Sequence, residues 1–99
     1  MSEGDEPFTI EFAREAEREI RDLPAADARM ILQKIQNLLS SEPFKGSKTR
    51  IKRLVGFTPP LYRLRVGDYR AYYRIVTQQV VVLTVLHKKD SERWLKRRS

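Results

Sequence analysis

The chain contains no cysteine and a single histidine. Without cysteine it can form neither a disulfide framework nor a thiolate nucleophile, and one histidine is a poor basis for a structural zinc site. No apolar run approaches the roughly 20 residues that cross a bilayer. The N-terminal residues MSEGDEP are acidic and lack the basic and apolar segments of a signal peptide. We therefore expect a cytoplasmic protein without disulfides, metal or membrane span, and assign it no cofactor.

Acidic residues are scarce in the second half of the chain. Residues 1–43 hold ten acidic and five basic residues, whereas residues 44–99 hold three acidic and fifteen basic ones. The two parts therefore carry net charges of −5 and +12, within a total of +7. A length of 99 residues indicates one domain, so the surface of that domain should be strongly polarised. Its positive side should attract a polyanion, although net charge that serves solubility alone remains the alternative.

The pattern of apolar residues predicts an α+β domain over residues 1–99, with residues 1–7 flexible. Alternation in residues 8–12 predicts a strand, and apolar residues at helical spacing predict two helices, in residues 13–24 and 25–39, that form a hairpin around Pro24. Residues 44–60 form a basic loop with a short strand at 51–54, and residues 60–76 form a β-hairpin. A strand covered on both faces follows at residues 80–86, and residues 88–99 make a basic helix or tail. The order β-α-α-β-β-β implies a mainly antiparallel sheet with the helical hairpin on one face.

The hairpin PLYRLRVGDYRAYYRIV places arginines opposite one another. Gly67 and Asp68 predict a type II′ turn, which pairs Arg65 with Arg70. Period-2 geometry then puts on the core face Tyr62, Leu64, Val66, Tyr69, Ala71, Tyr73 and Ile75. The other, open face carries Arg63, Arg65, Arg70, Tyr72 and Arg74.

Like charges directly across an antiparallel pair destabilise it by roughly 0.2–1 kcal/mol, and no acidic residue stands among these arginines. The arrangement favours a face that binds phosphate through guanidinium groups and stacks unpaired bases on aromatic rings. The alternative is an ordinary exposed surface, which applies most readily to Arg74 because it lies farthest from the turn.

The stretches LYRLRVGDYRAYYRIV and VVVLTVLHKKD resemble the RelE/ParE toxin superfamily of type II toxin–antitoxin systems, and the resemblance extends over residues 8–94. RelE-like members cut mRNA in the ribosomal A site without metal, by attack of a 2′-hydroxyl on the adjacent phosphate. ParE-like members share the fold but poison DNA gyrase. The resemblance implies as partners the ribosome, mRNA and an acidic, partly disordered antitoxin, with a toxin–antitoxin heterotetramer as one expected assembly.

The resemblance also assigns roles to particular residues. Arg63, Arg65, Arg70 and Lys88 fall on basic catalytic positions of the RelE pattern. Trp94 stands where many RelE-like nucleases carry a tyrosine; an indole could stack on a base or anchor the last helix, but could not transfer a proton.

Cleavage through the 2′-hydroxyl also needs proton transfer. The candidates are Lys88, Lys89, Tyr72 and His87, and the sequence does not choose among them. His87 has the best unperturbed pKa for this role, but a structural role for it stays open.

Further basic residues lie in the loop and in the C-terminal segment, where they either contact ribosomal RNA or are simply solvated. They are Lys45, Lys48, Arg50, Lys52, Arg53, Arg93, Lys96, Arg97 and Arg98. A RelE-like endoribonuclease is the first hypothesis; a ParE-like gyrase poison and a plain RNA-binding module are the alternatives.

Overall fold

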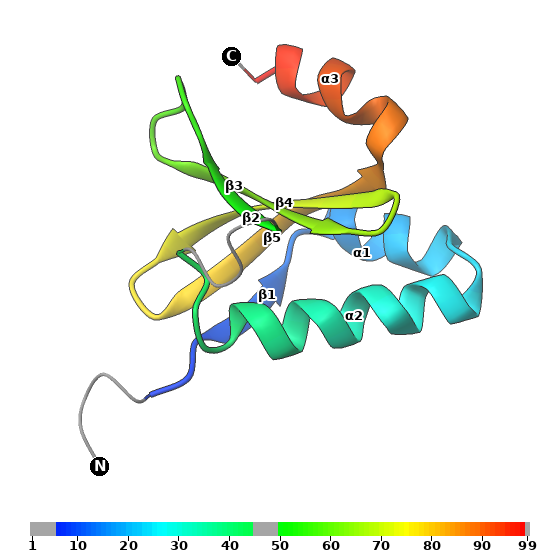
Figure 1. Ribbon diagram of the computed structural model, residues 1–99, viewed down its shortest axis with the longest axis horizontal. Helices are drawn as coiled ribbons and strands as arrows, with labels where there is room; N and C mark the ends of the chain where they lie inside the picture. The colour runs from blue at the N-terminus through cyan, green and yellow to red at the C-terminus, as the bar shows by residue number, and fades with distance from the viewer. Residues whose placement is uncertain (1–5, 45–49, 99) are drawn as a thin grey trace.

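A five-stranded sheet carries two helices on one face and a third helix on the other (Figure 1). The computed structural model describes residues 6–44 and 50–98. The elements follow in the order β1 (Thr9–Phe12), α1 (Arg14–Asp22), α2 (Ala25–Leu39), β2 (Ile51–Leu54), β3 (Leu61–Val66), β4 (Tyr69–Val76), β5 (Gln79–His87) and α3 (Lys88–Lys96). This order confirms the predicted α+β class and the short strand at residues 51–54. Within the described ranges, no helix has the length and apolar character that a membrane span requires.

The strands lie in the order β1-β5-β4-β3-β2. β1 runs parallel to β5, and the remaining neighbours are antiparallel. Because β1 and β2 form opposite edges of the sheet, α1 and α2 carry the chain across one face from the first edge to the second (Figure 1). The turn between these two helices lies at Leu23 and Pro24, as the sequence predicts.

The β3–β4 hairpin has the predicted register. Gly67 adopts a positive φ of 58°, and Asp68 is not among the residues with positive φ, which is the pattern of a type II′ turn. Arg65 consequently pairs with Arg70, and Val66 pairs with Tyr69. The predicted apolar face is also correct: its side chains pack with Ile31 of α2 and other helix residues into the main core.

The opposite face of the sheet is not open along its whole length, which corrects the prediction. Helix α3 packs across it through Trp94, which is 8% exposed. The Trp94 ring stacks on Tyr72 with centroids 4.9 Å apart and an interplanar angle of 19°, and Tyr72 is only 2% exposed. The sequence leaves two roles open for Trp94, base stacking and anchoring of the last helix, and in the structure Trp94 and Leu95 pack against the sheet.

The carboxylate of Glu19 in α1 binds beside a β-bulge in the pairing of β4 with β5. The pairing of β4 with β5 shifts between Tyr72 and Tyr73, and Leu83 is the extra residue. Beside this bulge, Glu19 accepts hydrogen bonds from Thr84 Oγ1 at 2.7 Å and from the Val85 N–H at 2.9 Å. Burial raises the pKa of Glu19, against the opposing effect of these hydrogen bonds.

The buried stack on the second face predicts a structural role for Trp94. Trp94→Ala should lower the free energy of unfolding by about 3 kcal/mol, because a large buried side chain is removed. Urea denaturation followed by circular dichroism measures this change, since the variant lacks the only tryptophan. Val55→Ala serves as the control, as Val55 is 94% exposed. Equal stability of Trp94→Ala and the wild type would contradict the packing of α3.

The raised pKa of Glu19 predicts a pH dependence of stability. The folded protein holds the Glu19 proton more tightly than the unfolded chain does, so this contribution is complete at low pH and declines as pH rises above 4.5. A glutamine at this position would keep an oxygen acceptor but would not titrate. The free energy of unfolding of the wild type minus that of Glu19→Gln should therefore fall between about pH 4 and pH 7. Thermal or urea unfolding across that range checks the slope, and parallel pH profiles would show that Glu19 does not titrate in this way.

Candidate functional site

Three arginines stand in one row across three neighbouring segments. Arg65 pairs with Arg70 across the hairpin. The Arg65 N–H donates to the Arg50 carbonyl at 2.8 Å, which extends the β2–β3 ladder by one residue and places Arg50 beside Arg65. No carboxylate forms an ion pair with any of the three in residues 6–44 and 50–98. The row therefore carries positive charge that the described part of the protein does not neutralise.

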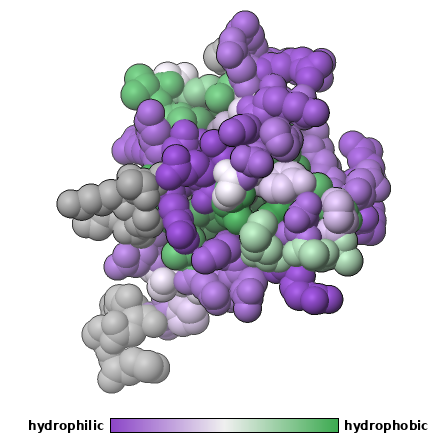
Figure 2. All heavy atoms as spheres, turned by 45° about the vertical axis from the view of Figure 1, so that its right-hand side comes forward, coloured by the Kyte–Doolittle hydropathy of each residue, from purple (hydrophilic) through white to green (hydrophobic). Residues whose placement is uncertain are grey.

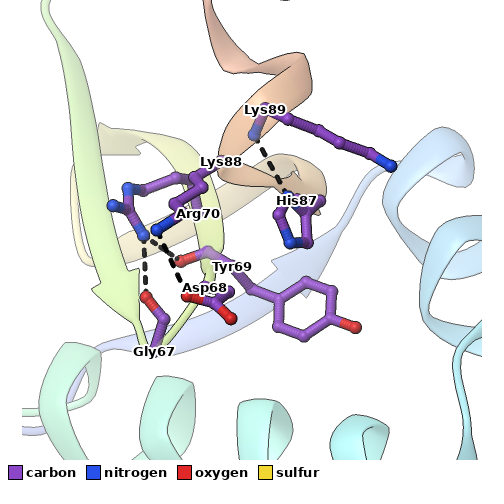
Figure 3. A network of polar contacts seen from close by, with 7 residues as sticks. All are labelled: Gly67, Asp68, Tyr69, Arg70, His87, Lys88 and Lys89. Atoms are coloured by element: carbon purple, nitrogen blue, oxygen red, sulfur yellow. Dashed lines mark hydrogen bonds and ion pairs between the residues drawn. The ribbon is translucent and has the colours of Figure 1, made fainter.

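Arg70 is held in place by the backbone of the turn. Its Nη1 donates to the Gly67 carbonyl at 3.0 Å and to the Tyr69 carbonyl at 2.9 Å (Figure 3). Burial lowers the pKa of Arg70, and the charges of Arg63 and Arg65 lower it further. The guanidinium remains protonated at neutral pH, so the lowered pKa reflects its burial first and the neighbouring positive charges second.

Lys88 and Asp68 close one side of the same site. Lys88 is the first residue of α3, and its N–H donates to the Asp68 carbonyl at 2.7 Å. Its Nζ lies 3.4 Å from Asp68 Oδ1 (Figure 3). Both side chains are exposed, and such pairs contribute only about 0–1 kcal/mol to stability. The ion pair therefore orients the two groups more than it stabilises the fold.

A cavity of about 500 Å³ opens at this end of the hairpin. Its walls contain Arg65, Val66, Gly67, Asp68 and Arg70 from the hairpin, with Arg50, Lys88, Met30 and Lys34 from other elements. Five of these side chains are cationic and one is acidic. Hydrophilic residues dominate the surface in Figure 2, which turns the right-hand side of Figure 1 toward the viewer. The cavity is thus suited to a compact anionic ligand.

Of the four residues expected to be catalytic, the structure brings three to the cavity. Arg65, Arg70 and Lys88 line it, whereas Arg63 stands in the next row, paired with Lys52 of β2 and Tyr72 of β4. Arg63 still contributes charge to the site, as its effect on the pKa of Arg70 shows. Arg74 lies farther away, opposite Val81, and does not line the cavity.

Apart from Lys88, the residues expected to transfer protons or stack on bases lie outside the cavity. Tyr72 and Trp94 are buried against each other. His87 pairs with Tyr69, so its ring lies on the core side, away from Arg70 (Figure 3). Its Nδ1 accepts a hydrogen bond from the Lys89 N–H at 3.1 Å and thereby caps α3. The Lys89 side chain extends away from Arg70 (Figure 3).

The other basic residues that the structure describes lie on β2 and on α3 with its C-terminal end. Lys52 and Arg53 are exposed on β2, and Lys45 and Lys48 fall outside the described residues. On α3, Arg93 pairs with Asp90 and Lys96 pairs with Glu92, so part of this charge is neutralised locally. Lys89, Arg93, Lys96 and Arg97 surround a shallow hollow on the same helix.

Arg98 takes part in packing, which separates it from the other basic residues of the C-terminal segment. Its guanidinium lies 4.3 Å from the centroid of the Trp94 ring and forms an ion pair with Glu15 of α1 at 3.7 Å. These contacts hold the end of α3 against the domain, so Arg98 is less available than Arg97 for an external phosphate.

Sequence reasoning treated Asp68 only as a turn residue, and it missed two further cavity residues, Met30 and Lys34, both on α2. They are four residues apart and therefore lie on the same side of the helix. This spacing was visible in the sequence, but the position of the hairpin turn beside that side of α2 follows only from the tertiary packing.

Comparison with known proteins identifies the class. Residues 10–92 match the family described as "ParE toxin of type II toxin-antitoxin system, parDE". Toxin RelG of Mycobacterium tuberculosis is 32% identical over 86 residues, which cover 85% of this chain and 94% of that protein. The chain is thus a toxin of a type II toxin–antitoxin system. It belongs to the RelE/ParE superfamily, as its hairpin sequence suggests.

Solved structures support the same assignment. A chain of the RelBE2 toxin–antitoxin complex from Mycobacterium tuberculosis superposes with a TM-score of 0.68 and 30% identity, covering 82% of this chain and 91% of that one. A chain of the archaeal RelE–RelB complex from Pyrococcus horikoshii OT3 gives a TM-score of 0.68 and 25% identity, covering 82% and 94%. The fold and its toxin class are therefore shown at both the sequence and the structural level.

The row of like charges predicts that the Arg65 side chain does not stabilise the fold. Arg65→Gln should leave the free energy of unfolding unchanged or raise it by up to about 1 kcal/mol, because repulsion with Arg50 and Arg70 is relieved. Any gain should shrink as sodium chloride is added, since salt screens exposed charges. Urea denaturation at low and high salt measures both effects. Arg53→Gln, on an exposed β2 residue outside the cavity, is the control. A loss above about 1 kcal/mol in Arg65→Gln would mean that the guanidinium supports the fold.

Proposed function

We propose that this toxin is a metal-independent endoribonuclease that cleaves mRNA in the ribosomal A site. The observation that carries the proposal is the cavity at the hairpin turn, where five cationic side chains gather around a single carboxylate. Such a site matches a phosphodiester whose negative charge grows during the reaction. The similarity to RelE toxins supports the same choice.

The reaction has a simple atomic balance. The 2′-oxygen forms a bond to phosphorus and loses its proton, while the bond from phosphorus to the 5′-oxygen breaks and that oxygen gains a proton. The products are a 2′,3′-cyclic phosphate and a free 5′-hydroxyl, and no water is consumed. The protein must therefore bind the phosphate, accept one proton and donate another.

The cavity residues divide these tasks. Arg65 and Arg70 bind the scissile phosphate through their guanidinium groups, and Arg63 adds positive charge from the next row. Lys88 donates the proton to the departing 5′-oxygen. Asp68 supplies the one carboxylate of the described lining and accepts the 2′-hydroxyl proton. Its contact with Lys88 at 3.4 Å keeps donor and acceptor in one place.

The remaining basic surface contacts the ribosome, and the antitoxin blocks it. Lys52, Arg53, Arg93, Lys96 and Arg97 hold ribosomal RNA phosphates, and the loop residues Lys45 and Lys48 are assigned the same role. An acidic, partly disordered antitoxin would fold over the cavity and neutralise it, with a heterotetramer as one assembly. The solved relatives are toxin–antitoxin complexes, which supports such a partner.

One observation favours a second function, the poisoning of DNA gyrase. The matching family is described as ParE toxin, and in the described part of the chain neither a tyrosine nor a histidine lines the cavity. A ParE-like toxin would use the basic surface for binding alone.

Cleavage of mRNA in a translation extract tests the proposal. The wild type should produce cuts in register with codons, mapped by primer extension. Arg70→Ala should reduce cleavage by about 100-fold or more, because one donor to the developing charge is lost. Arg29→Ala, at an exposed position of α2 outside the cavity, should retain cleavage within a few-fold, and circular dichroism should show that all the proteins are folded.

Two results would decide against the nuclease. Intact mRNA together with trapped gyrase–DNA complexes would establish the second function. Cleavage by Arg70→Ala at the wild-type rate would remove the arginine row from the mechanism.

A further inference from the structure

The cavity has a second wall that the arginine row does not explain. Helix α2 supplies Met30 and Lys34 to it, in addition to the side chains of β3 and β4. Met30 is 40% exposed although it is a large apolar residue. Lys34 forms no ion pair with a carboxylate in the described residues, and it faces a cavity that already contains Arg50 and Arg65. Both side chains are therefore available to a ligand in the cavity.

The charge of the cavity exceeds what one phosphodiester neutralises. Five cationic residues and one acidic residue leave an excess of four positive charges. A phosphodiester contributes a single negative charge. The site therefore has the charge for more than one phosphate of a strand, and Lys34 comes from α2, outside the arginine row.

We propose that α2 forms a subsite for a nucleotide next to the scissile phosphate, an inference that rests on the proposed ribonuclease function. Lys34 binds the phosphate of that nucleotide, and Met30 packs against its base. A thioether side chain adapts to flat aromatic surfaces and makes favourable sulfur–aromatic contacts. A volume of about 500 Å³ accommodates a ligand of nucleotide size. Because a purine offers more surface to Met30 than a pyrimidine does, the subsite should prefer purines.

Binding of a short RNA that cannot be cleaved tests the subsite. Fluorescein-labelled hexamers with 2′-O-methyl groups lack the nucleophile, so anisotropy with the purified chain measures affinity alone. Lys34→Gln should weaken binding about 10-fold, which is the expected loss of a charge-assisted contact. It should also reduce the slope of log affinity against log salt by about 0.7, the amount expected for one phosphate of a single strand.

Matched variants on the same helix serve as controls. Arg29 is an exposed cation of α2 that does not line the cavity, so Arg29→Gln should leave the affinity and the salt slope unchanged within about two-fold. Met30→Ala should remove most of the preference for a purine hexamer over a pyrimidine hexamer. Leu32→Ala is its control, because Leu32 is 39% exposed and lies outside the cavity.

The outcomes separate this inference from the nuclease proposal. Equal salt slopes for Lys34→Gln and the wild type would overturn the subsite, even if mRNA is cleaved in the extract. Absence of hexamer binding by the wild type would overturn it as well. Binding that depends on Lys34 without cleavage of mRNA would support the subsite and reject the nuclease. An effect of Lys34→Gln on an acidic antitoxin peptide, but not on RNA, would reassign α2 to the antitoxin interface and overturn the inference.

Discussion

The pairing of Arg65 with Arg70 across the β3–β4 hairpin is the constraint on which the rest of the site depends. It costs up to about 1 kcal/mol in repulsion. A slip of one residue would avoid this pair but would turn Tyr73 and its neighbours away from the helices and bury the arginines. Each large apolar side chain contributes about 1.5–3 kcal/mol when buried, and an unpaired buried charge costs several more. Burial of the apolar side chains therefore fixes this register, although the register places Arg65 opposite Arg70.

Helix α3 divides the arginine-bearing face into two regions. Near the turn, Arg65 and Arg70 reach the cavity. Farther along the hairpin, Tyr72 lies beneath Trp94, and the Nε atoms of Arg63 and Arg74 are buried without a hydrogen-bond partner in the described residues. One face of one sheet thus serves two purposes. Its distal part anchors the C-terminal helix, and its proximal part leaves positive charge available to a ligand.

Local patterns in the sequence predicted much of this arrangement. Period-2 alternation and Gly67 were sufficient for the hairpin register, because both act within a few residues. The position of His87 was not predictable in the same way, since the bulge at Leu83 reverses which later residues of β5 face the core. The covered state of Tyr72 depends on a contact with Trp94, far away in the sequence. The cavity forms because Met30 and Lys34 of α2 lie near the turn at Gly67 and Asp68. No local sequence pattern indicates this proximity.

In the proposed reaction, the composition of the cavity gives a physical reason for dependence on the ribosome. The described lining offers electrostatic stabilisation through its guanidinium groups, but only one carboxylate and two ammonium groups for proton transfer. Such a site gains little unless the 2′-oxygen is already aligned with the phosphorus and the 5′-oxygen. Positioning of reacting groups can supply about 7–11 kcal/mol. A strand held rigidly by a large partner would provide that alignment, whereas free RNA would sample it rarely. The toxin would then be selective for translating mRNA because its own chemistry is incomplete without the geometry that the ribosome imposes.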